Sequence, residues 1–256
     1  HADALNNMAA IHLRHSQRET AQYYLERALL INPKDTVSAH MLQALSGNQN
    51  QAKTTPEYAC NLFNNYASHY EQHMQNALQY AIPHHIGATL HQLHALDNTA
   101  SLDLGCGTGL SGIVLREVSL HLTGVDIAER MLQEAQKKGI YDVLVQSELL
   151  DFLQQERLNK YDLIVAADVL PYFGDLKPLF EAISQRITDA GYFIFTTEIS
   201  KSLPWTLELS SRFSHSPDYI KTLLDSLGFN IIKQEQVSAR MHQGKTLDVM
   251  LYSTAH

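Results

Sequence analysis

SLDLGCGTGL, at residues 101–110, decides the fold of this 256-residue chain. It combines a short apolar strand, an acid at Asp103, and a turn in which glycine alternates with other residues. Glycine lets the backbone turn sharply and approach a ligand closely. Helical apolar spacing over 110–118 predicts a helix whose free N–H groups face whatever lies on the turn. The next strand, LTGVD, ends at Asp126, an acid suited to a ribose diol. This order predicts a nucleoside-cofactor site.

The glycine spacing distinguishes between nucleoside cofactors. A dinucleotide fingerprint that starts at Gly105 requires glycine at position 110, where this chain has Leu110. A nicotinamide-dependent oxidoreductase therefore remains only an alternative, which binding of a nicotinamide cofactor would revive. A P-loop is excluded because no Gly-Lys-Ser/Thr follows the glycines.

The run from Asp103 to Gly109 resembles motif I of the class I S-adenosylmethionine-dependent methyltransferases. Its pattern is D-x-G-x-G-x-G. A glycine turn that binds no ligand is the alternative, but the turn, the preceding acid and Asp126 occur together and in the right order. The resemblance implies methyl transfer with S-adenosylmethionine as cofactor and S-adenosylhomocysteine as product.

Bulk composition indicates a globular protein with one large domain, or a domain plus a small appendage. Hydrophobic residues make up 45% of the chain and charged residues 18%, which is enough for a substantial core. The net charge of −8 argues against nucleic-acid binding, which requires a basic surface. Two well-separated cysteines, Cys60 and Cys106, predict a cytoplasmic location. No apolar run has the length of a membrane span, so no membrane partner is predicted.

Residues 1–46 carry a helical-repeat pattern. Its small and apolar positions follow the spacings of the tetratricopeptide repeat, which is about 34 residues long. These positions are Leu5, Met8, Ala9, His12, Ala21, Leu25, Ala28 and Pro33. A generic helical hairpin is the alternative, because His12 and Leu5 replace the tyrosine and tryptophan usual in the repeat. One repeat cannot bury its own apolar face, so the segment either continues upstream or docks on the rest of the chain.

A polar stretch, 47–56, is predicted to link this segment to a second domain over 57–256. Helices within 57–98 are expected to cover the mouth of the cofactor site. From residue 101 strands and helices alternate, which predicts an α/β fold with a Rossmann-like, mostly parallel seven-stranded sheet. Residues 199–216 are expected to be irregular. The predicted strands are 101–104, 122–126, 142–148, 161–167, 191–198, 229–238 and 246–253, and the predicted helices are 110–118, 128–138, 175–188 and 217–227. The short turn HQGK joins the last two strands in an antiparallel hairpin.

The resemblance extends along the whole chain. The repeat segment, LFNNYASHYEQHM, motif I, AADVLPYFGDL, RFSHSPDYI and GKTLDVMLY are together similar to the bacterial predicted methyltransferases that contain tetratricopeptide repeats. The resemblance implies that the motif I glycines pass under the cofactor, that Asp103 reaches its amino group and that Asp126 holds its ribose. The cofactor-binding residues it implies are Tyr66, Tyr70, Asp103, Gly105, Cys106, Gly107, Gly109, Asp126, Ile127, Met131, Glu148, Leu149 and Asp168.

Several of these residues also have a purely structural explanation. Glu148 would be an exposed acid at the end of a strand, and Asp168 a cap for the following helix. Tyr66 and Tyr70 lie on one helical face, where tyrosines commonly serve core packing.

Methyl transfer mainly requires that donor and acceptor are held in line, and it needs a base only if the acceptor must lose a proton. Asp168, Tyr172 and His215 are the predicted catalytic residues. His215 is the candidate for acid–base chemistry, because loops between a strand and a helix at this edge often contact substrates. A surface histidine is the alternative. Arg212 and Trp205 of the same stretch are candidates to frame an acceptor.

The histidines do not predict a metal site. His69 and His73 share a helical face, as do His91 and His94, but no H-E-x-x-H and no completing ligands occur. The predicted function is methyl transfer to an unidentified small-molecule or protein acceptor. The helical repeat favours a protein partner, because such repeats bind peptides in a concave groove. A cofactor-binding scaffold without turnover is the alternative.

Overall fold

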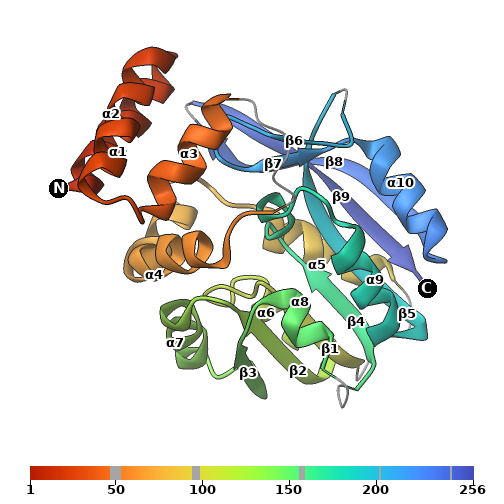
Figure 1. Cartoon of the computed structure of the whole chain (residues 1–256). Coiled ribbons are helices and arrows are strands. Elements are labelled where there is room, and N and C mark those ends of the chain that lie inside the picture. The colour runs from red at the N-terminus through yellow and green to blue at the C-terminus, as the bar shows by residue number, and fades with distance from the viewer. Residues whose placement is uncertain (47–52, 94–98, 156–158, 202, 243) are drawn as a thin grey trace.

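A computed structural model describes residues 1–46, 53–93, 99–155, 159–201, 203–242 and 244–256. Within these residues, nine strands form one sheet that runs through the centre of the molecule (Figure 1). The strands lie in the order β3-β2-β1-β4-β5-β7-β6, and β9 pairs with both β5 and β8. Their bounds are β1 Thr99–Leu104, β2 Ser119–Asp126, β3 Val143–Gln146, β4 Tyr161–Ala166, β5 Ile187–Ile199, β6 Trp205–Leu207, β7 Phe213–His215, β8 Asn230–His242 and β9 Lys245–Ala255.

Helices precede the sheet and alternate with its strands. Their bounds are α1 Ala2–Arg14, α2 Arg18–Ile31, α3 Thr36–Ser46, α4 Pro56–Gln72, α5 Ile82–Gln92, α6 Gly112–Arg116, α7 Glu129–Lys137, α8 Leu149–Leu153, α9 Lys177–Arg186 and α10 Pro217–Ser226. A π-helical turn, η1 His73–Ala77, continues α4, and a 3₁₀ turn, η2 Leu170–Tyr172, follows β4. No helix of the described ranges is long and apolar enough to cross a membrane.

Both faces of the sheet are covered by apolar layers. Along β4, Ile164 packs into a core with α8, α9 and α10, whereas Leu163 packs on the other face with α5 and α6. A strand buried on both faces carries a nearly continuous apolar run rather than an alternating one, as the last four residues of β4, LIVA at 163–166, do. These two apolar layers hold the central strands in place. Because the strands are parallel, their carboxyl ends lie at the same edge of the sheet.

The predicted fold class is confirmed. β1 pairs in parallel with β2 and β4, and β4 pairs in parallel with β5. β8 and β9 form the expected antiparallel hairpin, and β9 adds to β5 in the antiparallel sense. This parallel arrangement brings the glycine turn after β1, Asp126 at the end of β2 and Asp168 after β4 to the same edge.

The structure corrects the prediction that residues 199–216 are irregular. They contain β6 and β7, which pair with each other, and β7 also pairs with the end of β5. Each strand has three residues, which is too short for an alternation pattern to be recognised. Helix α6 is shorter than the predicted helix over 110–118, because the glycine turn extends to its first residue.

The N-terminal helices dock on the sheet domain. Helices α1 and α2 pack through small residues, including Ala9 and Ala21. Helix α3 places Ala44 against Phe213 of β7, and His40 Nε2 donates to the carbonyl of Ser211 at 2.9 Å. Figure 1 shows α1–α3 stacked beside α4 at one end of the molecule. The tetratricopeptide assignment and the domain boundaries stay predictions, and residues 47–52 of the predicted linker lie outside the described residues.

Candidate functional site

Three adjoining hollows occupy the carboxyl edge of the sheet. The strand-edge pocket lies over the ends of β1, β2 and β4, and the turn pocket lies beside the glycine turn. The tyrosine chamber lies between α4, η1 and the loop before β7. Most of the predicted site residues line the strand-edge pocket: Tyr70, Gly105, Gly107, Asp126, Ile127, Met131, Glu148, Leu149, Asp168 and Tyr172. Asp103 and Cys106 line the turn pocket.

The glycine turn is held against β2 and leaves space above it. The N–H groups of Gly105 and Cys106 donate to the carbonyl of Val125 at 2.8 and 3.0 Å. Gly105 has φ +70°, and a Cβ there would overlap the side chain of Val169. Gly107 has φ +53°, and a Cβ there would meet nothing within 4 Å. Packing against Val169 therefore requires glycine at position 105, whereas Gly107 faces open space.

Asp126 fastens the turn to the end of β2. Its Oδ2 accepts the N–H of Gly107 at 2.9 Å, and its Oδ1 accepts the N–H of Ala128 at 2.8 Å. Burial raises the pKa of Asp126, and these backbone hydrogen bonds oppose the rise. A carboxylate offers about four lone-pair positions. The backbone uses only part of this capacity, so the carboxylate can still accept from hydroxyl groups in the strand-edge pocket.

Asp103 lies in the turn pocket, at the end of β1. Tyr141 donates its hydroxyl proton to Asp103 Oδ2 at 2.7 Å. Burial raises the pKa of Asp103 to about 7, the Tyr141 hydrogen bond lowers it, and the nearby Asp126 raises it further. Cys106 lines the same pocket, and burial raises the pKa of its thiol. A neutral thiol is a poor nucleophile, so the contribution of Cys106 is to line the pocket rather than to react.

Two buried hydroxyl groups support a polar ligand in these pockets. Thr54 lines the strand-edge pocket and Thr108 lines the turn pocket, and the hydroxyl oxygen of each is buried without a hydrogen-bond partner among the described residues. Buried polar atoms normally have partners. Together with Asp126, Asp103 and the space above Gly107, they fit a nucleoside with a polar tail.

Glu148 and Gly109 have structural duties. The side chain of Glu148 accepts the N–H of Asp151 at 3.3 Å as the N-cap of α8, and Oε1 pairs with Lys53 Nζ at 3.1 Å, while the residue also lines the strand-edge pocket. Gly109 lines neither the strand-edge pocket nor the turn pocket. Its φ is +87°, and a Cβ there would lie 3.0 Å from the Tyr141 ring. Gly109 therefore has a conformational role in the turn, and its predicted cofactor contact stays a prediction.

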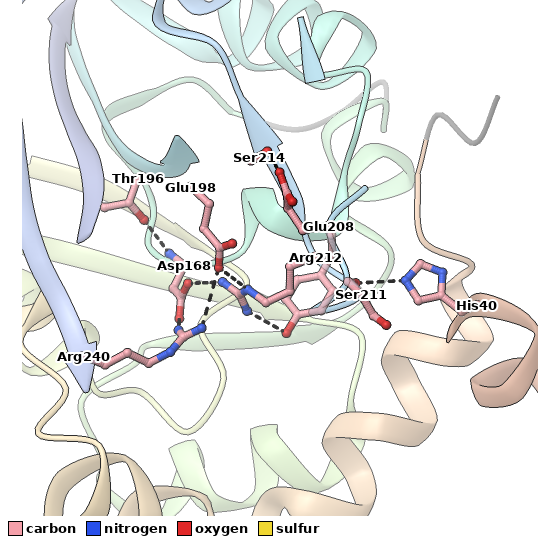
Figure 2. Close-up of polar contacts among 10 residues, drawn as sticks. His40, Asp168, Thr196, Glu198, Glu208, Ser211, Arg212, Ser214 and Arg240 are labelled. Atoms are coloured by element: carbon pink, nitrogen blue, oxygen red, sulfur yellow. Dashed lines mark hydrogen bonds and ion pairs between the residues drawn. The ribbon is translucent and has the colours of Figure 1, made fainter. Parts of the chain in front are cut away.

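A cluster of four charged side chains lies beside the pocket (Figure 2). Arg212 Nη2 contacts Asp168 Oδ1, its Nε donates to Glu198 Oε1 at 2.5 Å, and its Nη1 donates to the Tyr172 hydroxyl at 3.0 Å. Arg240 Nη1 donates to Asp168 Oδ2 at 2.8 Å. The four charged side chains are at most 13% exposed. We call Asp168, Glu198, Arg212 and Arg240 the charge cluster.

The charge cluster fixes the protonation states of Arg212 and of the neighbouring Tyr172. Burial disfavours the charge of Arg212, but Asp168, Tyr172 and Glu198 together raise its pKa well above the usual value. Burial raises the pKa of Tyr172, so its hydroxyl keeps its proton and can donate it to a ligand. Asp168 has φ +55°, and its N–H donates to Thr196 Oγ1 at 2.9 Å. An aspartate whose backbone is held in the left-handed region by its surroundings is typical of a functional site.

The tyrosine chamber shares a wall with the strand-edge pocket. Phe63, Tyr70, Asp168 and Tyr172 line both. Tyr66 lines the chamber but not the strand-edge pocket, and its hydroxyl bonds to Nδ1 of His73, which lines the chamber as well. The structure therefore separates the two predicted aromatics, with Tyr70 at the junction and Tyr66 in the chamber.

His215 lines none of these three hollows, contrary to its predicted catalytic position. Its Nε2 donates to the carbonyls of Phe173 and Gly174 at 2.8 and 3.1 Å. Its side chain fastens β7 to the loop after η2, and burial lowers its pKa to about 4 despite these two bonds. Trp205, which was a candidate to frame an acceptor, lines none of the three hollows either and packs on the cluster that contains Ala44.

Buried, neutral His215 predicts an acid-sensitive fold. Between pH 6.5 and 4 the unfolded state holds a proton on this imidazole and the native state does not, so stability falls as the pH falls. The expected loss is about 3 kcal/mol. Urea unfolding at pH 7, 5.5 and 4 measures it. His215→Gln should remove this part of the slope, whereas His91→Gln, at an exposed position, should keep it. An unchanged slope in His215→Gln contradicts the prediction.

Sequence reasoning missed Arg240, Glu198 and Thr54. Glu198 ends the apolar strand YFIFTTE, which is the same signal that identified Asp126. Arg240 carries no such signal. It follows a β-bulge between Ser238 and Arg240 in β8, which shifts the alternation of faces. Within the described ranges, no group of three or more histidine, cysteine, aspartate or glutamate side chains is arranged to hold a metal ion.

Comparison with known proteins supports a single family. The family model described as "Methyltransferase domain" matches residues 95–247. The magnesium-protoporphyrin O-methyltransferase of Synechocystis is 26% identical over 166 residues, covering 58% of this chain and 70% of that protein. The ubiquinone biosynthesis O-methyltransferase of Bordetella avium is 24% identical over 106 residues, covering 40% of this chain and 44% of that protein. The chain thus spans less than half the length of this second relative.

A solved structure shows the same fold. The crystal structure of magnesium protoporphyrin IX methyltransferase from Synechocystis, with bound S-adenosylmethionine, superposes with a TM-score of 0.54. It is 20% identical and covers 68% of this chain and 77% of that chain. The family model spans more than half of the sequence, from β1 to β9. The chain belongs to the methyltransferase-domain family.

Proposed function

We propose that this chain transfers the methyl group of S-adenosylmethionine to an oxygen atom of a small molecule held in the tyrosine chamber. The observation that carries the proposal is the wall that Phe63, Tyr70, Asp168 and Tyr172 share between the strand-edge pocket and the chamber. A donor in one hollow and an acceptor in the other would meet at these four residues. The two curated relatives named above are O-methyltransferases, which supports oxygen as the methylated atom.

The residues of the first two hollows suit this cofactor. Asp126 keeps acceptor capacity for the ribose hydroxyls, and Ile127 and Met131 offer apolar surface to the adenine. Asp103 and Thr108 face the turn pocket, where they suit the ammonium and carboxylate of the amino-acid end. When bound, S-adenosylmethionine supplies a methyl group already activated by its sulfonium. The protein then contributes alignment, which is worth about 7–11 kcal/mol.

The chamber suits a small acceptor that loses a proton. Its walls come from α1, α4, η1 and the loop before β7, and the aromatic side chains among them offer surface to a small acceptor. Tyr172 can donate its hydroxyl proton to the acceptor and orient a lone pair toward the strand-edge pocket. Among the described residues that line the chamber, His73 is the one histidine. An imidazole is the most common general base in enzymes. His73 takes the place that was predicted for His215.

Calorimetric titration of S-adenosylmethionine and S-adenosylhomocysteine tests the cofactor assignment. We expect saturable binding of both by the wild type, and no binding by Ala167→Phe, because Ala167 lines the strand-edge and turn pockets where they adjoin. Ala4→Phe, at an exposed position of α1, is the matched control and should bind normally. Wild type that binds neither ligand overturns the proposal. Methyl-labelled cofactor with a panel of hydroxylated small molecules then reports transfer as labelled product.

A further inference from the structure

The charge cluster gives the tyrosine chamber a neutral polar wall. Arg212 and Arg240 carry two positive charges, and Asp168 and Glu198 carry two negative charges. All four are almost buried, so the two signs compensate each other within the protein rather than in solvent. Asp168, Arg212 and Arg240 reach the chamber itself. A charged ligand would therefore disturb a balance that the protein already satisfies.

Arg240 keeps unused donors in this wall. Its Nη1 binds Asp168 at 2.8 Å, but its Nη2 is 3.7 Å from Glu198 Oε1, beyond hydrogen-bond distance. Its Nε has no hydrogen-bond acceptor in the described part of the chain, and the side chain is only 12% exposed. Neither nitrogen is completely buried, so water or a ligand can reach these N–H groups. The unused edge of the guanidinium thus provides a place for an oxygen atom of a ligand.

Apart from His73, Ser210 and Ser211, the rest of the described chamber lining is apolar or aromatic. Tyr58, Phe63, Tyr66 and Tyr70 supply aromatic surface, and Met74 and Leu78 supply aliphatic surface. Aromatic side chains favour offset or edge-to-face packing with another ring. A ligand that fills this space has an apolar or aromatic body.

Resting on the function proposed above, we propose that the methyl acceptor is an uncharged, ring-bearing small molecule whose carbonyl or hydroxyl oxygen binds Arg240. An anion would gain the Arg240 contact but would lie beside Asp168, which lines the chamber, and near Glu198, which pairs with both arginines, and like charges repel strongly where solvent is scarce. A cation would find both carboxylates already engaged by the two arginines. An uncharged oxygen uses the open donors without either penalty.

The N-terminal helices belong to this site. Ala10 of α1 lines the chamber, and Leu13 and Met41 line the neighbouring hollow, which also reaches Arg212 and Arg240. His40 holds the carbonyl of Ser211, the residue before Arg212. Helix α1 therefore forms part of the wall of the acceptor site, α3 supports that wall through Ser211, and a bulky side chain at Ala10 would project into the chamber.

Three small-molecule probes that share a phenol ring but differ in charge test the proposal. They are para-hydroxyacetophenone, which is uncharged, para-hydroxybenzoate, which is an anion, and tyramine, which is a cation. Saturation-transfer NMR titrations are made with the full chain saturated with S-adenosylhomocysteine. We expect the uncharged probe to bind at least about tenfold more tightly than either charged one, as a hydrogen bond to a charged group requires.

Variants assign the binding to the chamber. Ala10→Trp should abolish the probe signal, and Ala4→Trp, at an exposed position of the same helix, should preserve it. Arg240→Lys keeps the charge but loses the planar edge, so it should weaken the uncharged probe about tenfold. Equal or tighter binding of a charged probe, no binding of any probe, or binding unchanged in Ala10→Trp overturns the inference. Failure of S-adenosylhomocysteine to bind would instead overturn the proposed function, so the two failures are distinct.

Discussion

Replacing Arg212 by methionine is expected to lower the free energy of unfolding by about 3–5 kcal/mol. The guanidinium contacts Asp168, Glu198 and Tyr172, and it is 13% exposed. Methionine preserves much of the volume but leaves two buried carboxylates with Arg240 as their only cation in the cluster. An uncompensated buried charge is among the most destabilising changes a single substitution makes.

Chemical denaturation at pH 7 measures this cost, and two further variants identify its source. Arg130→Met, at an exposed arginine, should change stability by less than about 0.5 kcal/mol. Adding Glu198→Gln to Arg212→Met should recover part of the loss, because it removes one of the carboxylates left unpaired. The double variant is therefore expected to be more stable than the sum of the two single changes implies. A loss below about 1 kcal/mol in Arg212→Met would mean that the pair behaves like an exposed one.

The strand-edge pocket was predictable from sequence because its parts are local. Gly105 and Gly107 follow β1 directly, and Asp126 ends the next strand. One parallel pairing, β1 with β2, is enough to bring the Gly107 N–H to the Asp126 carboxylate. Any chain that forms this strand, turn and strand has little freedom to separate them. Ile127 and Met131 follow on the same short segment.

The charge cluster was not predictable because nothing in sequence spacing joins its members. Arg212 lies 44 residues from Asp168, and Arg240 lies 72 residues from it. Their encounter depends on β7 and β8, and β7 has three residues. Charged residues in a loop and a strand also look like ordinary surface positions. Only tertiary packing buries them and forces them to pair.

His215 and Tyr66 show how a local pattern misleads. A histidine in an unassigned stretch suggested a substrate contact, yet β7 buries it and directs Nε2 to two backbone carbonyls. Tyr66 and Tyr70 share a helical face, as their spacing predicts. Their hydroxyl surroundings differ, because Tyr66 reaches forward to His73 at the start of the π-helical turn. Spacing gives the face of a helix but not the hollow that a side chain enters.

Replacing Asp126 by alanine is expected to weaken S-adenosylmethionine binding by about 100-fold or more. The carboxylate is 8% exposed and accepts the N–H groups of Gly107 and Ala128. Its loss removes the acceptors for two ribose hydroxyls, each worth about 1.5–3 kcal/mol as a hydrogen bond to a charged group. It also frees the Gly107 N–H, so the glycine turn loses one of its ties to β2, while the bonds of Gly105 and Cys106 to Val125 remain.

Two matched variants separate loss of the clamp from loss of the fold. Asp126→Asn keeps one acceptor oxygen without its charge and should weaken binding by at least about tenfold, since one hydrogen bond to the ribose is lost and the other is no longer charge-assisted. Asp189→Ala removes an acid whose side chain is 97% exposed and should bind as the wild type does. Thermal unfolding of each variant shows whether it is folded at the titration temperature. Folded Asp126→Ala that binds within about threefold of the wild type would show that Asp126 contributes less than one ordinary hydrogen bond to the cofactor, and the ribose would then have to be held by other residues of the strand-edge pocket.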